Sequence, residues 1–305
     1  MAGPGSLIGV TGASGRIGRR FCAEALRCGY RVRELSRAGR ACTPGAELAD
    51  VDLGLDDGVP ANAVEGCSAI VHAAAYIPSD HHSLEEGARC WEVNVRGTAR
   101  LISAMRAAGV PRLLLLSSAN AYAPWLERPD ELAPLYPASR TLYLGSKIMQ
   151  ELVAAEECRR AGTRLATVRI SSVYGAEPCF GVVAVLARRL LERQPVELAD
   201  EGAFGADFVL ADDVVDAVRL LLSEEAEGIF NVASGTRTTI REIAGELVRL
   251  TGASADLVQF SSHGAEIDIG FPPIANEKIG TLGFRPTELR NGLARLLDSQ
   301  RTLLA

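Results

Sequence analysis

Residues 6–18 of the chain read SLIGVTGASGRIG, and this short stretch decides the fold. An apolar run typical of a buried strand is followed by Gly12, Gly15 and Gly18, and a helical pattern then begins. Glycines so placed allow a tight turn, close approach of the backbone to a phosphate and close helix–strand packing, although ordinary turns also use glycine. Because the loop joins the first strand to the first helix, we predict that it binds a dinucleotide pyrophosphate. Its residues are Gly12, Ser14, Gly15, Arg16, Ile17 and Gly18.

The first half of the chain alternates short apolar runs with helical patterns. Strands are predicted at residues 6–12, 30–36, 69–75, 112–119 and 164–170, and helices at residues 16–29, 94–109 and 142–162. Strands that are apolar throughout are typical of a parallel sheet covered on both faces. We therefore predict an α/β fold with a doubly wound parallel Rossmann sheet.

The pattern loosens after Gly175, where helices no longer alternate regularly with strands. This change predicts two domains: a dinucleotide-binding domain at residues 1–175 and a smaller mixed α/β C-terminal domain for the substrate at 176–305. Residues 206–235 are expected to return to the large sheet. No internal repeat or low-complexity linker separates the two parts.

Composition excludes several classes of partner. The net charge of −6 and the lack of a basic run argue against nucleic acid, and no apolar stretch reaches the roughly 18 residues of a membrane span. The N-terminus lacks the features of a signal peptide, and the seven cysteines are scattered without a C-x-x-C pair, so we expect a cytoplasmic protein with reduced thiols. His81 and His82 are adjacent and point apart, so no metal site is predicted.

The end of the second strand indicates which dinucleotide is bound. An acid that accepts from the ribose 2′-hydroxyl is typical of NAD sites, but here Ser36 and Arg37 stand at that point, and Glu34 is expected to point elsewhere. An arginine can pair with a 2′-phosphate. We therefore favour NADP, with NAD as the alternative; the simpler possibility is that Arg16 and Arg37 are solvated surface residues.

Taken in order along the chain, several motifs resemble those of one family. They are TGASGRIG, DVDL, HAAA, NVRGT, SSANAY, YLGSK, RISSVYG and LGFRP. Their ordered co-occurrence over nearly the whole length is similar to the extended short-chain dehydrogenases/reductases, the NAD-dependent epimerase/dehydratase family. The fold this resemblance implies is the one predicted above.

The resemblance also implies residue roles around the cofactor. Asp52 and Leu53 flank the adenine, and the small residues Ala73, Ala74 and Ala75 let the cofactor pass. The remaining residues expected at the cofactor are Asn94, Ser117, Tyr143, Lys147, Ile170, Ser172 and Val173.

Four residues match the catalytic set of the family: Ser118, Tyr143, Lys147 and Asn94. Tyr143 is the implied acid/base and Lys147 lies four residues later, which on a helix puts both side chains on one face. A free phenol has a pKa of about 10, and a neighbouring ammonium is expected to lower it. Ser118 is expected to hydrogen-bond the substrate oxygen, and Asn94 to be structural or a proton relay. The plain alternatives are that Ser118 caps a turn and that Asn94 bridges backbone groups.

The reaction remains open among related chemistries. Family dehydratases carry an acid just after the serine, whereas Ala119, Asn120 and Ala121 follow here, so dehydration is not expected. We favour an NADP(H)-dependent ketoreductase in which Tyr143 donates the proton; the alternative is a nucleotide-sugar epimerase with tightly bound NAD. Ala206 stands where nucleotide-sugar enzymes have an arginine, and the segment around His263 lacks a second one. A non-catalytic dinucleotide sensor or scaffold is a further alternative.

The substrate is expected beyond the carboxyl ends of the strands. The residues predicted to border it are Tyr76, Ser118, Ala119, Tyr122 and Ser172. The family also implies a homodimer through the helices after Asn94 and around Tyr143. Apolar residues on their outer faces are expected to include Leu101, Met105, Met149 and Leu152, which intrachain packing could also use.

Overall fold

The structure is a computed structural model that describes residues 3–37, 39, 42–81, 83–136, 141–175, 181–261 and 270–304. The chain forms two compact units. The first comprises Met1–Ala123, Pro134–Arg169 and Val215–Phe230, and the second comprises Pro124–Ala133, Ile170–Val214 and Asn231–Ala305. The predicted boundary at 175–176 lies within Ile170–Val214, and the predicted return segment 206–235 contains Val215–Phe230. Each unit is described by itself.

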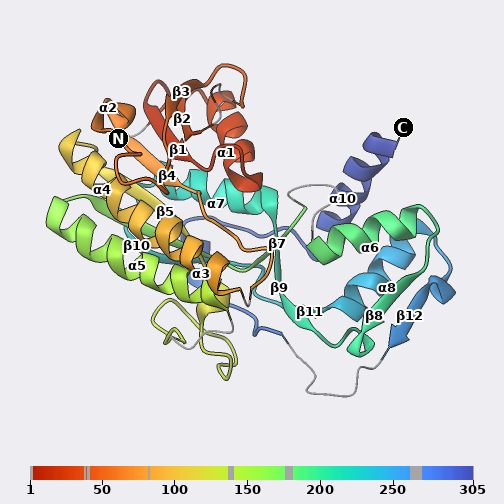
Figure 1. Ribbon diagram of the computed structural model, residues 1–305. Helices are drawn as coiled ribbons and strands as arrows, with labels where there is room; N and C mark the ends of the chain where they lie inside the picture. Colours follow the sequence, from red (N-terminus) through yellow and green to blue (C-terminus); the bar gives the residue numbers. More distant parts are fainter. Residues whose placement is uncertain are drawn as a thin grey trace. The chain divides into compact units, whose positions relative to one another are not determined.

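A seven-stranded sheet with the order β10-β6-β5-β4-β1-β2-β3 dominates the first unit (Figure 1). Its strands are β1 (Leu7–Thr11), β2 (Arg31–Ser36), β3 (Glu47–Asp50), β4 (Ala69–His72), β5 (Arg112–Ser118), β6 (Arg164–Ile170) and β10 (Gly228–Val232). The pairs from β3 through β2, β1 and β4 to β5 are parallel. The order reverses between β1 and β4, which is the arrangement of a doubly wound Rossmann sheet, so the predicted fold class is confirmed.

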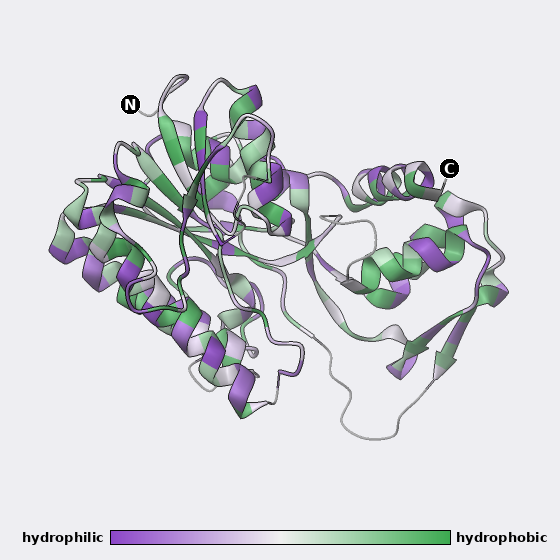
Figure 2. Ribbon diagram, turned by 45° about the horizontal axis from the view of Figure 1, so that its top comes forward, coloured by the Kyte–Doolittle hydropathy of each residue, from purple (hydrophilic) through white to green (hydrophobic). Residues whose placement is uncertain are grey.

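Helices cover both faces of this sheet. They are α1 (Arg16–Arg27), α2 (Ala61–Val64), α3 (Leu84–Cys90), α4 (Gly97–Ala107), α5 (Leu142–Ala161) and α7 (Ala211–Ser223), with a π-helical turn η1 (Trp91–Arg96) and a 3₁₀ turn η2 (Ala119–Ala121). In Figure 1, α4 and α5 lie on one face and α1 and α7 on the other. Burial of these apolar helix faces against apolar strands supplies most of the stabilising free energy. Figure 2 shows green and purple residues alternating along the helices, as expected when one helix face is buried.

Two local features differ from the sequence prediction. The predicted strands did not include the edge strand β3, whose sequence ELAD carries two acids. The helix expected at 94–109 starts earlier, because Ser83 caps α3 by accepting from the backbone N–H of Glu86, and η1 continues α3 into α4. Gly97 opens α4 where a Cβ would lie 2.7 Å from the carbonyl oxygen of Leu53, so this close approach requires glycine.

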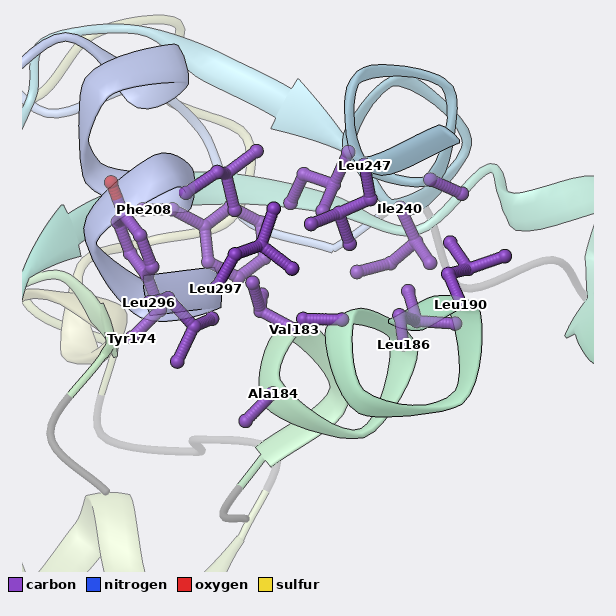
Figure 3. Packing of buried hydrophobic residues seen from close by; sticks show 14 of the residues in the cluster. Tyr174, Val183, Ala184, Leu186, Leu190, Phe208, Ile240, Leu247, Leu296 and Leu297 are labelled. Atoms are coloured by element: carbon purple, nitrogen blue, oxygen red, sulfur yellow. The ribbon is translucent and has the colours of Figure 1, made fainter. Parts of the chain in front are cut away.

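The second unit contains two small sheets, of order β11-β9-β7 and β12-β8, and helices that pack together in its core. Its elements are β7 (Ser172–Tyr174), α6 (Gly181–Leu191), β8 (Val196–Ala199), η3 (Asp200–Gly202), β9 (Gly205–Leu210), β11 (Arg237–Thr239), α8 (Ile240–Thr251), η4 (Ala255–Leu257), β12 (Val258–Ser261), α9 (Glu277–Thr281) and α10 (Leu289–Leu304). Leu186 and Leu190 of α6 point toward Leu247 of α8 in the core (Figure 3). Helix α8 is fixed at its start by a capping box between Thr239 and Glu242.

One buried carboxylate organises the loops of the second unit. Asp207 on β9 is 1% exposed, and five donors from three other segments bond to it. They are the hydroxyl of Ser171, the backbone N–H groups of Ser234, Gly235 and Ile274, and the hydroxyl of Ser234, at 2.7–3.2 Å. Burial raises the pKa of Asp207 in spite of these donors. A buried carboxylate with this many partners ties the segments together.

Within the described residues, no helix combines the length and apolar character needed to cross a bilayer.

Candidate active site

The glycine loop takes the shape expected of a phosphate cradle. Gly12 has a φ of +67°, and a Cβ there would lie 2.6 Å from the backbone nitrogen of Ala74. A Cβ at Gly18 would overlap the carbonyl oxygen of Gly12, and a Cβ at Gly15 would lie 3.0 Å from the same oxygen. The loop therefore packs backbone against backbone, and side chains at these positions would fill the cradle.

The N-terminus of α1 is open to an anion. Gly15 caps the helix without a side-chain hydrogen bond, and the first turn, which begins with Arg16 and Ile17, contains no acid. Ser14 and Gly15 are exposed at this end. Uncapped N–H groups and the helix dipole favour a phosphate at this position.

Two hydroxyls in the predicted cofactor region are buried without a partner among the described residues. They are Oγ of Ser36, at the end of β2, and Oγ of Ser117, near the end of β5. Buried hydroxyls are normally hydrogen-bonded, so both are available to a ligand. Together with the glycine cradle and the open helix end, they fit a bound dinucleotide.

Arg37 follows Ser36 and is 77% exposed on its side chain. Its guanidinium lies 3.8 Å from a carboxylate oxygen of Asp52, whose other oxygen accepts from the N–H of Gly54. Leu53 is buried in the core of the first unit. Glu34 is fully buried and accepts from the N–H groups of Cys42 and Thr43, and that it points away from the ribose stays a prediction.

The HAAA segment lies against the glycine loop. The N–H of Ala73 donates to the carbonyl of Thr11 at 3.3 Å, and the N–H of Ala74 donates to the Thr11 hydroxyl at 3.2 Å. Ala73, Ala74 and Ala75 are half-buried, and their small side chains keep them candidates for the cofactor path.

Tyr143 and Lys147 lie one turn apart on α5, which Thr141 caps through the N–H of Leu144. Tyr143 is half-buried and Lys147 is 2% exposed. Nζ of Lys147 donates to the carbonyl of Leu116 on β5 at 2.7 Å and to the side chain of Gln150. Burial lowers the pKa of Lys147 to about 8, against a smaller opposing effect of Glu151. The helix thus fixes the ammonium at the carboxyl end of β5.

The expected effect of Lys147 on the phenol is not found in the structure. The pKa of Tyr143 is raised to about 12, first by burial and then by the Cys90 thiol. Lys147 is not among the causes of this shift, and two of its donors go to Leu116 and Gln150, so the lowering expected from the ammonium stays a prediction. The ring of His81 lies edge-on to the Tyr143 ring, with centroids 6.4 Å apart, and sequence reasoning assigned His81 no role there.

Ser118 ends β5 and also caps the turn η2, since its Oγ accepts from the N–H of Asn120 at 3.3 Å. Ala119 and Ala121 are buried. Because Ala119, Asn120 and Ala121 are the residues that follow Ser118, no carboxylate comes directly after it in the chain. The plain capping role of Ser118 therefore exists in the structure, and a hydroxyl has further capacity to donate to a ligand.

Asn94 lies in the π-helical turn and is fully buried. Its side chain accepts from the N–H of Tyr76 at 2.7 Å and donates to the carbonyl of Tyr76 at 3.1 Å and to the hydroxyl of Ser146 at 3.0 Å. Asn94 thereby fixes the backbone of Tyr76, while the Tyr76 hydroxyl donates to Glu86 at 3.4 Å. Asn94 therefore does bridge backbone groups, which is the plain alternative that the sequence left open.

Tyr122 is 3% exposed, and its hydroxyl accepts from Arg169 at 2.9 Å. Arg169 in turn pairs with the buried carboxylate of Glu151 at 2.8 Å. Tyr122 and Ala119, both predicted to border the substrate, therefore lie within the packed interior of the first unit, and their contact with a substrate stays a prediction.

The remaining predicted residues belong to the second unit. Ile170 is buried at the end of β6, and Ser172 and Val173 lie on β7. His82, His263 and the segment directly after Gly175 lie outside the described residues. Ala206 is fully buried in the core of the second unit. In the described part of the chain, no group of three or more histidine, cysteine, aspartate or glutamate side chains is placed to hold a metal ion.

The predicted dimer helices need a correction. Leu101 and Met105 are fully buried in the core of the first unit, so they do not lie on an outer face. Leu152 is 63% exposed and Met149 is half-buried.

Sequence reasoning missed a buried polar chain beneath Lys147. It consists of Thr11, His72, Thr98 and Gln150, all fully buried and joined by hydrogen bonds. The only signal in the sequence is polar residues inside otherwise apolar runs, as with Thr11 and His72 at the ends of β1 and β4.

Comparison with known proteins identifies the class. A sequence model of the NAD dependent epimerase/dehydratase family matches residues 8–233. The chain therefore belongs to this family, whose members are extended short-chain dehydrogenases/reductases, and the predicted resemblance is confirmed.

Particular relatives make the comparison sharper. The chain is 30% identical to UDP-glucose 4-epimerase of Mycolicibacterium smegmatis over 265 residues, covering 80% of this chain and 82% of the relative. It is 27% identical to dTDP-L-rhamnose 4-epimerase of Burkholderia thailandensis, covering 74% of this chain and 73% of the relative. The crystal structure of UDP-glucose 4-epimerase of Thermus thermophilus in complex with NAD superposes with a TM-score of 0.82 at 26% identity, covering 97% of this chain and 99% of the other.

Proposed function

We propose that the protein is a nucleotide-sugar epimerase that works on a retained NAD. Support comes from its similarity to 4-epimerases over most of their length, including one solved with NAD. The ketoreductase favoured from sequence has no such support among these relatives and becomes the second candidate. The observation that carries the proposal is at the end of β5, where Lys147 donates a hydrogen bond to the carbonyl of Leu116, one turn from Tyr143. No acid stands in the residues directly after Ser118. An acid beside the serine would instead favour elimination of water.

The residues of the first unit have separable tasks in this proposal. The glycine loop and the start of α1 bind the pyrophosphate, and Lys147 orients the nicotinamide ribose. Bound dinucleotide supplies reversible hydride acceptance at a carbon that carries a hydroxyl. Ser118 donates a hydrogen bond to the substrate oxygen, and Oη of Tyr143 exchanges the proton with it.

The high pKa of Tyr143 sets a condition on this chemistry. Burial raises the pKa of Tyr143 to about 12, further above neutral pH than the ordinary phenol value of about 10. Proton uptake by Tyr143 therefore requires that its pKa falls once ligands are bound, and Lys147, one turn away, is the cation available for this on α5.

The proposal is tested with UDP-glucose, UDP-glucuronate and dTDP-rhamnose, incubated with purified protein without added dinucleotide. We expect NMR signals of the 4-epimer from at least one of them, and none with Tyr143→Phe. Absence of any epimer, together with consumption of NADPH by a ketone, would contradict it.

A reductase using NADP(H) is the second candidate, and two observations favour it. Ser36 and Arg37 stand at the ribose end of β2, with the Ser36 hydroxyl unpaired among the described residues. A protonated phenol at Tyr143 also suits proton donation to a ketone. Loss of nicotinamide absorbance when NADPH is mixed with 4-keto nucleotide sugars would support this candidate.

We also propose that two copies associate through α5, where Leu152 is exposed. Sedimentation at increasing concentration tests this, and Leu152→Glu should shift the equilibrium toward monomer.

A further inference from the structure

A buried chain of hydrogen bonds connects the glycine loop to the Lys147 ammonium, and the direction of each bond can be deduced. The Thr98 hydroxyl donates to the carbonyl of Asn94 at 2.6 Å. A hydroxyl has a single proton, so Thr98 must accept from its other two neighbours. These are Nε2 of His72 and Nε2 of Gln150, each at 2.8 Å.

The tautomer of His72 follows from this count. Nε2 carries the proton that it donates to Thr98, so Nδ1 is an acceptor when the ring is neutral. The Thr11 hydroxyl donates to Nδ1 at 2.6 Å, and its oxygen accepts from the N–H of Ala74. Burial, and secondarily the charge of Lys147, lowers the pKa of His72 to about 3, which keeps the ring neutral.

The orientation of Gln150 follows as well. Because its Nε2 is the group that faces Thr98, its Oε1 must face Nζ of Lys147. An ammonium has three N–H donors, and the carbonyl of Leu116 and Oε1 of Gln150 are the acceptors recorded for it among the described residues. One donor remains for a ligand.

We propose that Gln150 is a positioning residue for Lys147. Its amide is oriented by the hydrogen bond that its Nε2 donates to Thr98. With the carbonyl of Leu116 it gives the ammonium two acceptors, which fix its position and set how tightly it holds its proton. This inference rests on the proposed function only in taking Lys147 as the residue that serves the dinucleotide.

The electrostatic surroundings make Gln150 a sensitive position. The charged neighbour on α5 is Glu151, which is already paired with Arg169. His72 on β4 is neutral and close enough for the charge of Lys147 to lower its pKa. The carbonyl of Leu116 on β5 accepts from Lys147, and Tyr143 lies one turn back on α5. A change of charge or of acceptor at Gln150 is therefore expected to change the pKa of Lys147 without compensation by another group nearby.

The sequence offers an unusually direct experiment, because the chain contains only two lysines, Lys147 and Lys278. Protein labelled with ¹³C-lysine gives two side-chain signals, which Lys278→Arg assigns. Their chemical shifts are followed against pH in protein from which any bound dinucleotide has been removed, so the readout needs no activity.

Two substitutions should move Lys147 in opposite directions. Gln150→Glu places a carboxylate beside the ammonium and should raise the pKa of Lys147 by about 1–3 units. Gln150→Met keeps the length of the side chain but removes the acceptor, and should lower that pKa. Thr98→Val, which releases the amide from its orientation, should act in the same direction as Gln150→Met and replaces it if that variant does not fold.

The matched control is Gln300→Met in the second unit. Gln300 is also buried and donates to the carbonyl of Ala184 at 2.8 Å, so it tests for general effects of losing a buried amide. It should leave both lysine signals unchanged.

A second readout is calorimetric binding of NAD to protein from which the retained dinucleotide has been removed, where Gln150→Met should weaken binding and Gln300→Met should not. Shifts of the Lys147 signal in the same direction in Gln150→Glu and Gln150→Met, or no shift in either, would overturn the inference. Opposite shifts in a protein that epimerises nothing would leave the positioning role standing and remove the proposed function instead.

Discussion

The two units both bury polar groups, but they satisfy them differently. In the second unit Asp207 receives five hydrogen bonds, all from the protein itself. In the first unit the Lys147 ammonium has two recorded acceptors, and the nearby Ser117 hydroxyl has none in the described part of the chain. A saturated buried group stabilises the scaffold, whereas an incompletely saturated one is prepared for a ligand.

This contrast predicts that the largest effect on activity comes from the first unit. Tyr143→Phe removes the proton that moves at the substrate and should lower kcat by roughly 10²–10⁴-fold. The ring and its packing remain, so binding of NAD measured by calorimetry should stay within about twofold, well below a 1.4 kcal/mol change. A near-normal kcat in this variant would show that Tyr143 does not transfer the proton.

In the second unit the expected effect is on stability. Asp207→Asn removes the charge and turns an amide N–H toward donors such as those of Ser234 and Gly235. We expect a loss of about 3 kcal/mol in the free energy of unfolding, measured by urea denaturation. The Lys147 titration should not change, and a change there would mean that the two polar clusters are coupled.

The buried histidine of the first unit should produce a pH dependence of stability. The pKa of His72 is lowered from 6.5 to about 3, so between these values the unfolded chain binds a proton that the folded chain does not. Stability should therefore fall as the pH drops below 6.5, with a contribution approaching ~1.4 kcal/mol per pH unit.

The contribution of His72 is measured as the difference between the wild type and His72→Gln, from urea unfolding at several pH values. The free energy of unfolding of the variant should fall less steeply as the pH drops below 6.5. The same pH dependence in both proteins would show that protonation of His72 does not destabilise the fold.

The smallest predicted effect concerns cofactor choice at the rim of the first unit. Arg37→Ala should weaken NADP binding about tenfold, the equivalent of ~1.4 kcal/mol, and leave NAD binding nearly unchanged. Arg31→Ala is the matched control, because Arg31 begins the strand that Arg37 follows, is exposed and pairs with Glu47. Equal losses for both dinucleotides would exclude a 2′-phosphate contact at Arg37.

Local spacing explains what the sequence could predict. Gly12, Gly15 and Gly18 and the pair Tyr143–Lys147 could be recognised because each group lies within one turn or loop. The main sheet could be predicted from local sequence too, because most of its strands are short apolar runs. The edge strand β3 was not predicted, because its sequence ELAD carries two acids and its residues are only partly buried.

Long-range contacts explain what was missed. Gln150 and His72 are 78 positions apart, so their approach exists only after folding. The same holds for the pKa of Tyr143, which burial and Cys90 raise, and for Leu101 and Met105, whose burial in the core could not be told from an interface by sequence.

The proposal that this chain is an epimerase with a retained cofactor is tested most directly by identifying the dinucleotide that freshly purified protein releases on denaturation, in parallel with epimer formation by the same sample. We predict NAD in stoichiometric amount and 4-epimer formed without any addition. Release of no dinucleotide, with turnover only when NADPH is supplied, would contradict the account.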